Sequence, residues 1–449
     1  METERQKVGH RPDINDGDNM LPTYRTEPSA DDAVDAWLAS HGQDEGAPAI
    51  AGDTSRPELY SQTRWEPLFR QMREAAPLNR VEGTAYGDYW NVCSHSLIME
   101  VEGKPDLFSS SWKYGGITIA DPAPGEEFQL PMFIAMDEPE HSAQRKTVAP
   151  AFTPAHIAEL AVKLRAHTAT VLDSLPVGSR FDWVEKVSIE LATSMLATIL
   201  GFPWEDRHLL TFWSDWAGHM EAARIPELFQ VRREMLTEMA TYFHLLWEQR
   251  RASPEGTDLL GMMIRSDSMS EMGPMEFIGN LALLIVGGND TSRTSMSAAI
   301  LGLDRFPDER AKLIADESLL PNAVQEIIRW HTPIAHMRRT ATADCELAGQ
   351  RIAAGDKLAL WYISANRDEA VFPDADRLDL SRANARRHLS FGHGIHRCVG
   401  ARLAELQLRI LLEELMKRRL QVNVVGELRR VHANFVNGFR QMEVELTSY

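Results

Sequence analysis

The stretch Phe391-Gly-His-Gly-Ile-His-Arg-Cys-Val-Gly400 isolates one cysteine, Cys398, in a loop that is rich in glycine and flanked by cations. The glycines let the backbone pass close to a bulky, flat partner without a Cβ clash. An apolar segment with heptad-like spacing, residues 401–415, follows directly, and as a helix it would direct the positive end of its dipole at the sulfur. A thiolate needs positive surroundings and backbone N–H donors to stay deprotonated. The loop therefore predicts that Cys398 is a ligand of haem iron.

The residues of this loop, taken alone, leave two alternatives. A lone cysteine is usually a small, buried hydrophobic residue. His393, His396 and Cys398 would also suggest a zinc cluster. That interpretation is the weaker one, because structural zinc takes four ligands and the chain has no second knuckle of Cys and His residues.

The composition limits the classes of partner. The chain has 449 residues and a formal net charge of −18, which argues against nucleic acid or an anionic membrane surface as the main partner. Its three cysteines, Cys93, Cys345 and Cys398, are scattered and odd in number. Such usage gives no disulfide framework and is typical of the reducing cytoplasm, where we expect the protein to reside.

The chain reads as one unit preceded by a polar segment. No linker rich in Gly, Ser or Pro divides it, so we expect residues 27–449 to form a single domain. Residues 1–26 are polar and have no apolar core, which favours a mobile segment over a signal peptide or an anchor. The longest apolar runs are far shorter than the ~20 residues that a membrane-spanning helix needs.

Helical periodicity dominates the rest of the chain, and Pro or Gly marks many of the gaps. Strand-like segments are fewer, so the pattern predicts a mainly α fold with small β-sheets rather than a βαβ repeat. Helices are expected over residues 154–175, 183–200, 205–222, 226–252, 273–303 and 307–332, and strands within 81–92, 337–363 and 431–446.

The helix expected over 273–303 contains Gly287-Gly-Asn-Asp-Thr-Ser292 at its middle. Paired glycines and polar residues are costly inside a buried helix, and breaks of this kind collect at functional sites. The sequence therefore predicts an interruption of the helix here. The glycines would equally admit a closely packed neighbour, and the residues alone leave both explanations open.

Two further pairs of polar residues stand one helical turn apart. His141 and Arg145 would present two donors on one face, which suits an anionic partner. Glu326 and Arg329 would form an ion pair, which at a solvated surface contributes roughly a few tenths of a kcal/mol. Each pair alone is as easily an ordinary surface feature.

In their order along the chain, these elements resemble the cytochrome P450 family. The Cys398 loop matches the family's haem-binding pattern Phe-x-x-Gly-x-His-x-Cys-x-Gly. The resemblance covers residues 75–449 and implies a fold in which haem lies between a long central helix and the loop of the cysteine ligand. The matching elements upstream of the loop are His141-x-x-x-Arg145, Gly287-Gly-x-Asp-Thr291, Glu326-x-x-Arg329 and Arg339.

The resemblance implies how haem b, iron protoporphyrin IX, would be held. Cys398 would bind the iron as its axial ligand, with Phe391 and Gly400 beside it in the loop. The donors that would hold the haem propionates are His141, Arg145, Arg339 and His396.

The resemblance also implies the chemistry of the central helix. O2 bound to iron needs room, which the glycines would supply. Thr291 would hold a water by hydrogen bonds, and Asp290 would relay protons inward from solvent. A lone Thr more often bonds only the carbonyl four residues earlier. Glu326 and Arg329 would belong to the scaffold of the haem pocket.

Several segments resemble more closely the bacterial alkane terminal hydroxylases of this family, three-component enzymes that hydroxylate medium-chain n-alkanes, and sometimes fatty acids, at the ω-carbon. His393 departs from the aromatic residue expected at its position, which bears on redox tuning. The match is weaker over 211–248, so the preferred chain length stays open. The matching segments are 128–137, 286–291, 335–340, 388–392, 396–400 and 403–409.

Terminal selectivity sets a physical requirement. A primary C–H bond is stronger than its secondary neighbours, and each tenfold reversal of the intrinsic preference takes about 1.4 kcal/mol. Small apolar differences discriminate weakly, so the pocket would have to select by shape. By analogy with pocket segments of the family, and with core packing as the rival interpretation, the expected walls are Ile117, Ile119, Leu284, Gly288, Pro333, Ile334, Ala335 and Phe435.

The chain carries no fused flavin or iron–sulfur domain, so electrons must come from partner proteins. The resemblance implies NAD(P)H as the source, an FAD-containing ferredoxin reductase and a small [2Fe–2S] ferredoxin. An acidic ferredoxin would dock on a basic patch beside the cysteine loop. We expect this patch to consist of Arg386, Arg387, Arg397 and Arg402.

Other functions remain open from the sequence. The same oxygenation on a terpenoid, a sterol or a fatty acid is a close alternative. A non-catalytic haem–thiolate sensor or binding protein is a second, although the Asp290–Thr291 pair argues against it. A zinc hydrolase is the most distant.

Overall fold

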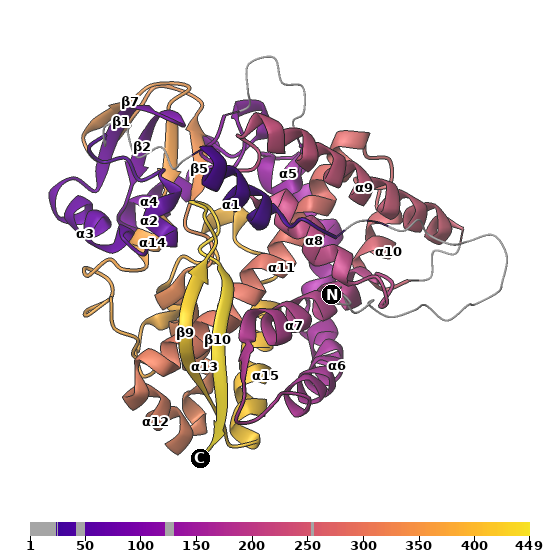
Figure 1. Cartoon of the computed structure of the whole chain (residues 1–449). Helices are drawn as coiled ribbons and strands as arrows, with labels where there is room; N and C mark the ends of the chain where they lie inside the picture. The colour runs from indigo at the N-terminus through magenta and orange to yellow at the C-terminus, as the bar shows by residue number, and fades with distance from the viewer. Residues whose placement is uncertain (1–23, 25, 42–49, 122–129, 253–255) are drawn as a thin grey trace.

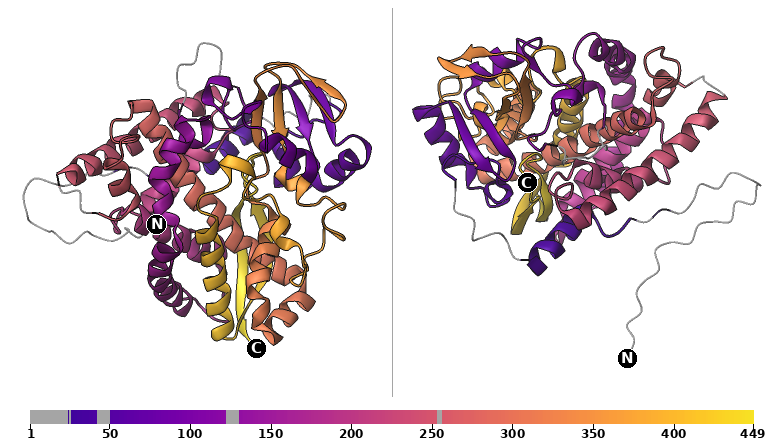
Figure 2. Two further views of the ribbon diagram at one scale, coloured as in Figure 1. Left: turned by 180° about the vertical axis from the view of Figure 1, so that it is seen from behind. Right: turned by 90° about the horizontal axis from the view of Figure 1, so that it is seen from above.

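The computed structural model describes residues 24, 26–41, 50–121, 130–252 and 256–449. Helices predominate in this part of the chain, with small sheets among them (Figures 1 and 2), which confirms the predicted fold class. The segment predicted to be mobile, residues 1–26, lies outside the described residues except for Tyr24 and Thr26. None of the described helices combines the length and the apolar character needed to cross a bilayer.

The helices expected from residues 154, 205, 226, 273 and 307 begin within three residues of those positions, whereas the helix expected from 183 begins as a π-helical turn, Val184–Ile189. The α-helices that the structure describes are α1 (Ala30–His41), α2 (Pro57–Ser61), α3 (Trp65–Ala75), α4 (His95–Glu102), α5 (Glu140–Val148), α6 (Pro154–Asp173), α7 (Glu190–Leu200), α8 (His208–Gly218), α9 (Pro226–Arg251), α10 (Leu259–Ile264), α11 (Pro274–Arg305), α12 (Pro307–Ala315), α13 (Leu320–His331), α14 (Tyr362–Ala365) and α15 (Ala401–Lys417).

The predicted helix over 307–332 is wrong in one respect, because the structure divides it into α12 and α13. The chain leaves helical geometry at Asp316, and the Asp316 carboxylate accepts a hydrogen bond from the N–H of Ser318 at 3.0 Å. A short 3₁₀ turn, Glu317–Leu319, then leads into α13. An acidic side chain that competes for backbone N–H groups ends a helix more readily than apolar spacing reveals.

The predicted interruption of the central helix is also wrong, since α11 is continuous from Pro274 to Arg305. The polar residues satisfy their hydrogen bonds without breaking the backbone ladder: Thr291 Oγ1 donates to the carbonyl of Gly287 at 2.8 Å. The two glycines differ. A Cβ at Gly288 would stand 2.9 Å from Leu196 of α7, whereas a Cβ at Gly287 would meet open space. Both glycines border the cavity, and the absence of a side chain at Gly288 also allows Leu196 to pack closely.

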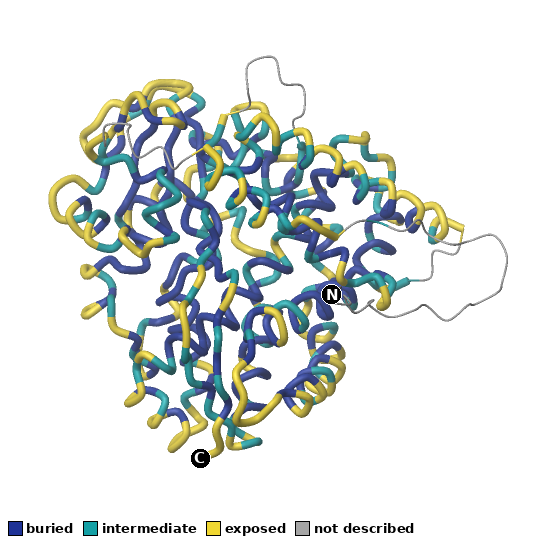
Figure 3. The backbone as a smooth tube through the Cα atoms, viewed as in Figure 1, coloured by how far each residue is buried: buried dark blue, intermediate teal, exposed yellow. Residues whose placement is uncertain are grey.

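Helix α11 crosses the middle of the molecule and packs against α7, α8, α9, α13 and α15 (Figures 1 and 3). Its first half, with Leu281 and Ile285, belongs to a hydrophobic cluster shared with α8 and α9. Its second half, with Met296 and Ile300, belongs to another cluster shared with α13 and α15. The polar segment 287–292 lies between these two clusters, so both of its flanks are anchored by packing.

The strands form a five-stranded sheet of order β1-β2-β8-β5-β3, a three-stranded sheet of order β4-β10-β9 and the pair β6-β7. The region predicted as one strand, 81–92, is part of the antiparallel hairpin of β1 and β2. The strands are β1 (Leu78–Thr84), β2 (Gly87–Val92), β3 (Phe108–Ser109), β4 (Arg180–Asp182), β5 (Met337–Ala341), β6 (Cys345–Leu347), β7 (Gln350–Ile352), β8 (Lys357–Leu360), β9 (Leu420–Arg430) and β10 (Phe439–Ser448).

Only the later part of the region 431–446 is a strand, β10, and its partner β9 precedes that region. Residues 431–438 instead connect the two strands and bond to the segment after α13. The N–H of Asn437 donates to the carbonyl of Pro333 at 2.8 Å, and the carbonyl of Phe435 accepts from the N–H of Ala335 at 2.8 Å. This tertiary pairing carries Phe435 to the functional site.

The side chains of Glu326 and Arg329 form a fully buried ion pair on α13. Arg329 donates to Glu326 through Nε and Nη2, both at 2.7 Å. Its Nη1 donates to the carbonyls of Asn366 and Ala375, and Arg382 Nε donates to Glu326 at 3.0 Å. The pair therefore ties α13 to the chain segment that leads to Cys398.

We predict that Arg329→Leu lowers the free energy of unfolding by about 3–5 kcal/mol, because it leaves the buried Glu326 carboxylate without its main partner. Urea denaturation followed by circular dichroism measures the change. The control is Arg351→Leu, which removes an exposed pair with Asp344 and should cost less than about 1 kcal/mol. Equal losses in the two variants would contradict the prediction.

Candidate active site

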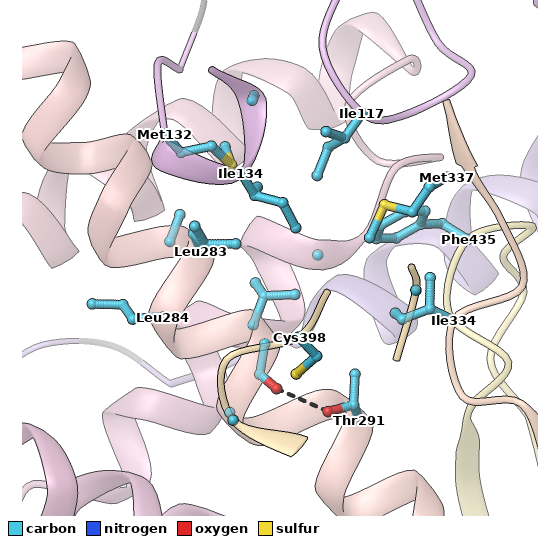
Figure 4. Close-up of a pocket in the computed structure, with 18 of the residues that line it drawn as sticks. Ile117, Met132, Ile134, Leu283, Leu284, Thr291, Ile334, Met337, Cys398 and Phe435 are labelled. Carbon is cyan, nitrogen blue, oxygen red and sulfur yellow. Dashed lines mark hydrogen bonds between the residues drawn. The ribbon is translucent and has the colours of Figure 1, made fainter. Parts of the chain in front are cut away.

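A cavity of about 630 Å³ lies between α11 and the loop that precedes α15. Cys398 and Thr291 line it from these two elements, and apolar side chains surround the space near them (Figure 4). The labelled walls in this view are Ile117, Met132, Ile134, Leu283, Leu284, Ile334, Met337 and Phe435.

The loop of Cys398 is held by its backbone. The N–H of Cys398 donates to the carbonyl of Phe391 at 2.8 Å, and Gly394 has a φ of +65°. A Cβ at Gly394 would collide with the carbonyl of Glu102, so both the angle and the close approach require glycine. These constraints, together with the start of α15 at Ala401, fix where the sulfur stands.

The Cys398 thiol has a raised pKa. Burial raises it, although the N–H of Gly400 and the guanidinium of Arg145 oppose the shift. A cysteine that binds a metal cation is deprotonated outright. The surroundings of the sulfur thus stabilise its thiolate only in part. A bound metal cation would supply the rest of the stabilisation.

Basic side chains gather at another part of the wall. The rings of His141 and His396 are 4.2 Å apart. His396 Nε2 bonds Ser110 Oγ at 2.8 Å and His141 Nδ1 lies 3.3 Å from Glu138, but His396 Nδ1 and His141 Nε2 are buried without a hydrogen-bond partner in the described part of the chain. Arg145 and Arg339 line the same cavity. Two unpartnered imidazole nitrogens and two guanidinium groups fit a ligand that carries carboxylates.

The pKa values of both histidines agree with a site for a ligand that carries carboxylates. Burial lowers the pKa of His141. Burial, followed by the positive charge of Arg339, lowers the pKa of His396 to about 2. Cations that depress one another in a buried site are stabilised by an anion placed between them.

Glu102, a residue without a sequence motif, holds Arg339 in place. Its carboxylate accepts from Arg339 Nη2 at 2.9 Å, from Tyr362 Oη at 2.6 Å and from the N–H of His393 at 2.9 Å. Burial raises the pKa of Glu102. Its place at the end of an ordinary amphipathic helix, α4, gave no sequence signal, because the partners come from segments more than 200 residues away.

Thr291 and Asp290 lie on different sides of α11. Thr291 lines the cavity. The Asp290 side chain is buried against α8, where Ser214 Oγ donates to Asp290 Oδ1 at 2.7 Å and Arg293 Nη2 lies 3.2 Å from the same atom. Burial raises the pKa of Asp290, which Arg293 opposes. The threonine is thus beside the reaction space and the acid behind it.

The structure corrects two of the predicted pocket residues, Ile119 and Ala335. Both are almost fully buried in a hydrophobic cluster with Tyr60 and Trp361 rather than at the cavity wall. Their neighbours Ile117 and Ile334 line the cavity. Ile334 directly precedes Ala335 in an extended segment, where adjacent side chains point to opposite sides. The predicted residues that do line it are Ile117, Leu284, Gly288, Pro333, Ile334 and Phe435.

The zinc alternative is not supported by the arrangement of donors. Within the described ranges, no three or more His, Cys, Asp or Glu side chains come together as a set of metal ligands. His393 instead joins Glu102 through its backbone N–H.

A model of the family named cytochrome P450 matches residues 154–427. The chain is a cytochrome P450. Linalool 8-monooxygenase of Pseudomonas putida is 35% identical over 407 residues, which are 88% of this chain and 98% of the relative. Methyl-branched lipid omega-hydroxylase of Mycobacterium tuberculosis is 32% identical over 389 residues, 84% of this chain and 90% of the relative.

The solved structure of cytochrome P450-153 from Novosphingobium aromaticivorans is 60% identical to the chain. It superposes with a TM-score of 0.85 over 88% of this chain and 100% of the other. As a member of the family, this P450 is a haem monooxygenase that uses O2 and electrons from reductase partners. The cysteine loop and the basic wall fit haem, with Cys398 as the residue that would hold the iron.

We predict that His141→Leu loses haem about tenfold faster than the wild type, because one charged hydrogen bond contributes ~1.5 kcal/mol. Transfer of haem to apomyoglobin, followed by absorbance, measures the rate. Lys146→Leu, an exposed change on the same helix, is the control and should behave like the wild type. The same rate in both variants would remove His141 from the haem site.

Proposed function

We propose that this P450 hydroxylates the terminal carbon of medium-chain n-alkanes. The observation that carries the proposal is the apolar wall around the space between Cys398 and Thr291, with Leu284, Ile334 and Phe435 in it. A substrate without polar groups is recognised by shape alone. The similarity to cytochrome P450-153 and to an omega-hydroxylase of methyl-branched lipids supports the choice.

Shape has to overcome bond strength at the reacting carbon. A methylene group beside the methyl end reacts more easily, and reversing a tenfold preference takes about 1.4 kcal/mol. Branched and thioether side chains close to Thr291 restrict how far a chain can bend before it reaches the iron. A chain that enters end-on then presents its methyl group first.

In the reaction, haem bound through Cys398 supplies reductive activation of O2 and insertion of one oxygen atom into a C–H bond. The apolar walls bind the alkane and exclude water. Thr291 Oγ1 donates its hydrogen to the carbonyl of Gly287, so both of its lone pairs can accept a hydrogen bond from a water in the cavity. Asp290 supplies protons from the other side of α11.

We further propose haem b as the cofactor and NAD(P)H, an FAD-containing ferredoxin reductase and a [2Fe–2S] ferredoxin as the electron supply, in the cytoplasm. Four exposed arginines beside the cysteine loop support a docking site for an acidic ferredoxin. In the part of the chain that the structure describes, none of them has an ion-pair partner. They are Arg386, Arg387, Arg397 and Arg402.

We predict that purified holoenzyme, given octane, NADPH, a surrogate [2Fe–2S] ferredoxin and its reductase, forms mainly 1-octanol, as identified by gas chromatography. Leu284→Ala, which widens the wall, should raise the share of 2-octanol severalfold because the chain can bend. The proposal fails if the wild type gives mostly subterminal alcohols, or if it hydroxylates linalool and leaves octane unchanged.

A second substrate class, fatty acids, is favoured by one residue. Arg224 lines the cavity on the segment between α8 and α9. Its Nη2 donates to the carbonyl of Ala85 at 2.6 Å and its guanidinium lies 3.8 Å from the ring centre of Tyr86. The structure records no carboxylate paired with Arg224 among the described residues, so a substrate carboxylate would find a free charge there.

We predict that Arg224→Gln weakens the binding of dodecanoate about fivefold and leaves octane binding unchanged, since an exposed ion pair contributes ~1 kcal/mol. Titration of the substrate-induced absorbance change of haem measures both affinities. Arg233→Gln, on α9 and outside the cavity wall, is the matched control. A loss of octane affinity in Arg224→Gln would point to damage of the wall instead.

A further inference from the structure

Behind Asp290, on the side of α11 that faces away from the cavity, several buried charged side chains come together. Arg293 Nη2 lies 2.6 Å from Asp215 Oδ1 and 3.2 Å from Asp290 Oδ1. The titratable and charged groups that face one another here are Asp31 of α1, Asp215 and His219 at the end of α8, Glu221, Tyr86, Asp290 and Arg293 of α11, and Arg440 of β10.

Asp31 reaches this group from the N-terminal helix α1. Its Oδ1 lies 3.3 Å from His219 Nε2 and its Oδ2 lies 3.6 Å from Arg440 Nε. Helix α1 packs on α8 and α9 (Figure 1). It lies outside residues 154–427, which the family model matches. A carboxylate near the catalytic acid therefore comes from a part of the chain that the motifs of the family do not include.

Two neighbours of Asp31 on α1 have a different role. Asp32 and Asp35 both pair with Arg440 on the outside of the helix, and their side chains are 60% and 41% exposed. The Asp31 side chain is only 14% exposed. Asp32 and Asp35 thus help to dock the helix, whereas Asp31 alone belongs to the buried group.

The group holds more acidic than basic side chains. Four carboxyl groups, those of Asp31, Asp215, Glu221 and Asp290, face Arg293, His219 and Arg440, and Arg440 is shared with the exposed Asp32 and Asp35. An uncompensated buried charge is costly, and such a group takes up a proton instead.

Two members of the group, Asp215 and His219, have raised pKa values. Burial raises the pKa of Asp215 to about 6. Burial alone would lower the pKa of His219, but the hydrogen bond and the charge of Asp31 raise it. Both shifts favour the protonated forms of Asp215, which shares Arg293 with Asp290, and of His219.

The group extends from partly exposed side chains to the cavity wall. The side chains of Asp31 and Asp215 retain 14% and 15% exposure, whereas Asp290 retains 4%. On the inner side, Asp290 Oδ2 lies beneath Gly218, which lines the cavity, and a Cβ at that position would stand 2.7 Å from this oxygen. Only a glycine separates the acid from the reaction space at this point.

We propose that Asp31 and His219 are positioning residues for proton delivery, so that helix α1 forms part of the proton supply to Asp290. The inference rests on the proposed function, in which Asp290 serves as the proton relay. Each hydroxylation converts R–H, O2, two electrons and two protons into R–OH and water. Asp290 releases a proton to the cavity side, and the buried group regains one from solvent at Asp31 and Asp215.

The test compares Asp31→Asn with Asp32→Asn in the full-length holoenzyme, with octane, NADPH and the surrogate ferredoxin system. The readouts are octanol formed per NADPH consumed, hydrogen peroxide released, and the solvent deuterium isotope effect on octanol formation. We expect Asp31→Asn to lower the octanol yield per NADPH at least threefold and to increase both the peroxide and the isotope effect. Asp32→Asn should stay within about 1.5-fold of the wild type, because it loosens only the exposed docking contact.

Two further variants separate proton delivery from folding. His219→Gln keeps a hydrogen-bond donor without the charge and should reproduce Asp31→Asn. Asp31→Glu, which restores the carboxylate, should recover most of the octanol yield. The reduced carbon-monoxide spectrum and the absorbance change on adding octane should be unaltered in every variant. His219→Gln also serves as the test if Asp31→Asn does not fold.

The outcomes distinguish this inference from the function on which it rests. If Asp290→Asn lowers the octanol yield per NADPH and Asp31→Asn and His219→Gln do not, the role of α1 is refuted and the relay stands. If Asp290→Asn itself has no effect, the relay fails and the inference fails with it. Equal losses of octanol yield per NADPH in Asp31→Asn and Asp32→Asn would show that both changes act by loosening helix α1. That result would overturn the proposal.

Discussion

The buried carboxylate of Glu326 fixes the path of the chain before the cysteine loop, and the position of every other part of the site depends on that path. Arg329 and Arg382 both donate to it, as does the N–H of Asp379. Arg329 in turn holds the carbonyl of Asn366. The Asn366 side chain then bonds the N–H of Leu389 at 2.7 Å, two residues before the loop begins. Buried charges that are paired on all sides resist rearrangement, because any movement would leave one of them unpaired.

Helix α11 lies opposite the cysteine loop and forms the other wall of the cavity. Its two halves are anchored in different hydrophobic clusters. Between them two glycines border the cavity, and one of them, Gly288, also packs on α7. Thr291 and Asp290 are adjacent in sequence and therefore lie about 100° apart around the helix. One side of the helix thus faces the cavity, and the other carries Asp290, which is the proton relay in the proposed function.

The sequence does not predict which way an individual side chain points. The helix and strand pattern, the cysteine loop and the His141–Arg145 pair are local, since their spacing alone places them on one face or in one turn. Ala335 is buried one residue away from the cavity-lining Ile334, because adjacent side chains of an extended segment point to opposite sides, whereas Ile119 lies in a bend that has no sequence periodicity. The sequence gives no signal for Glu102 or Asp31, because a single acidic residue in an amphipathic helix forms no motif. Its role depends on partners that are distant in the chain.

The sequence by itself determined the fold class and predicted the cysteine ligand of the haem, because both depend on patterns of residues close together in the chain. Only the tertiary structure decided which apolar residues face the cavity, that the Glu326–Arg329 pair is buried rather than solvated, and that Asp290 lies in a group of charges supplied by α1, α8, α11 and β10. The physical reason is that burial and electrostatic environment are properties of packing between distant segments, and the cost of a charge is set by what surrounds it.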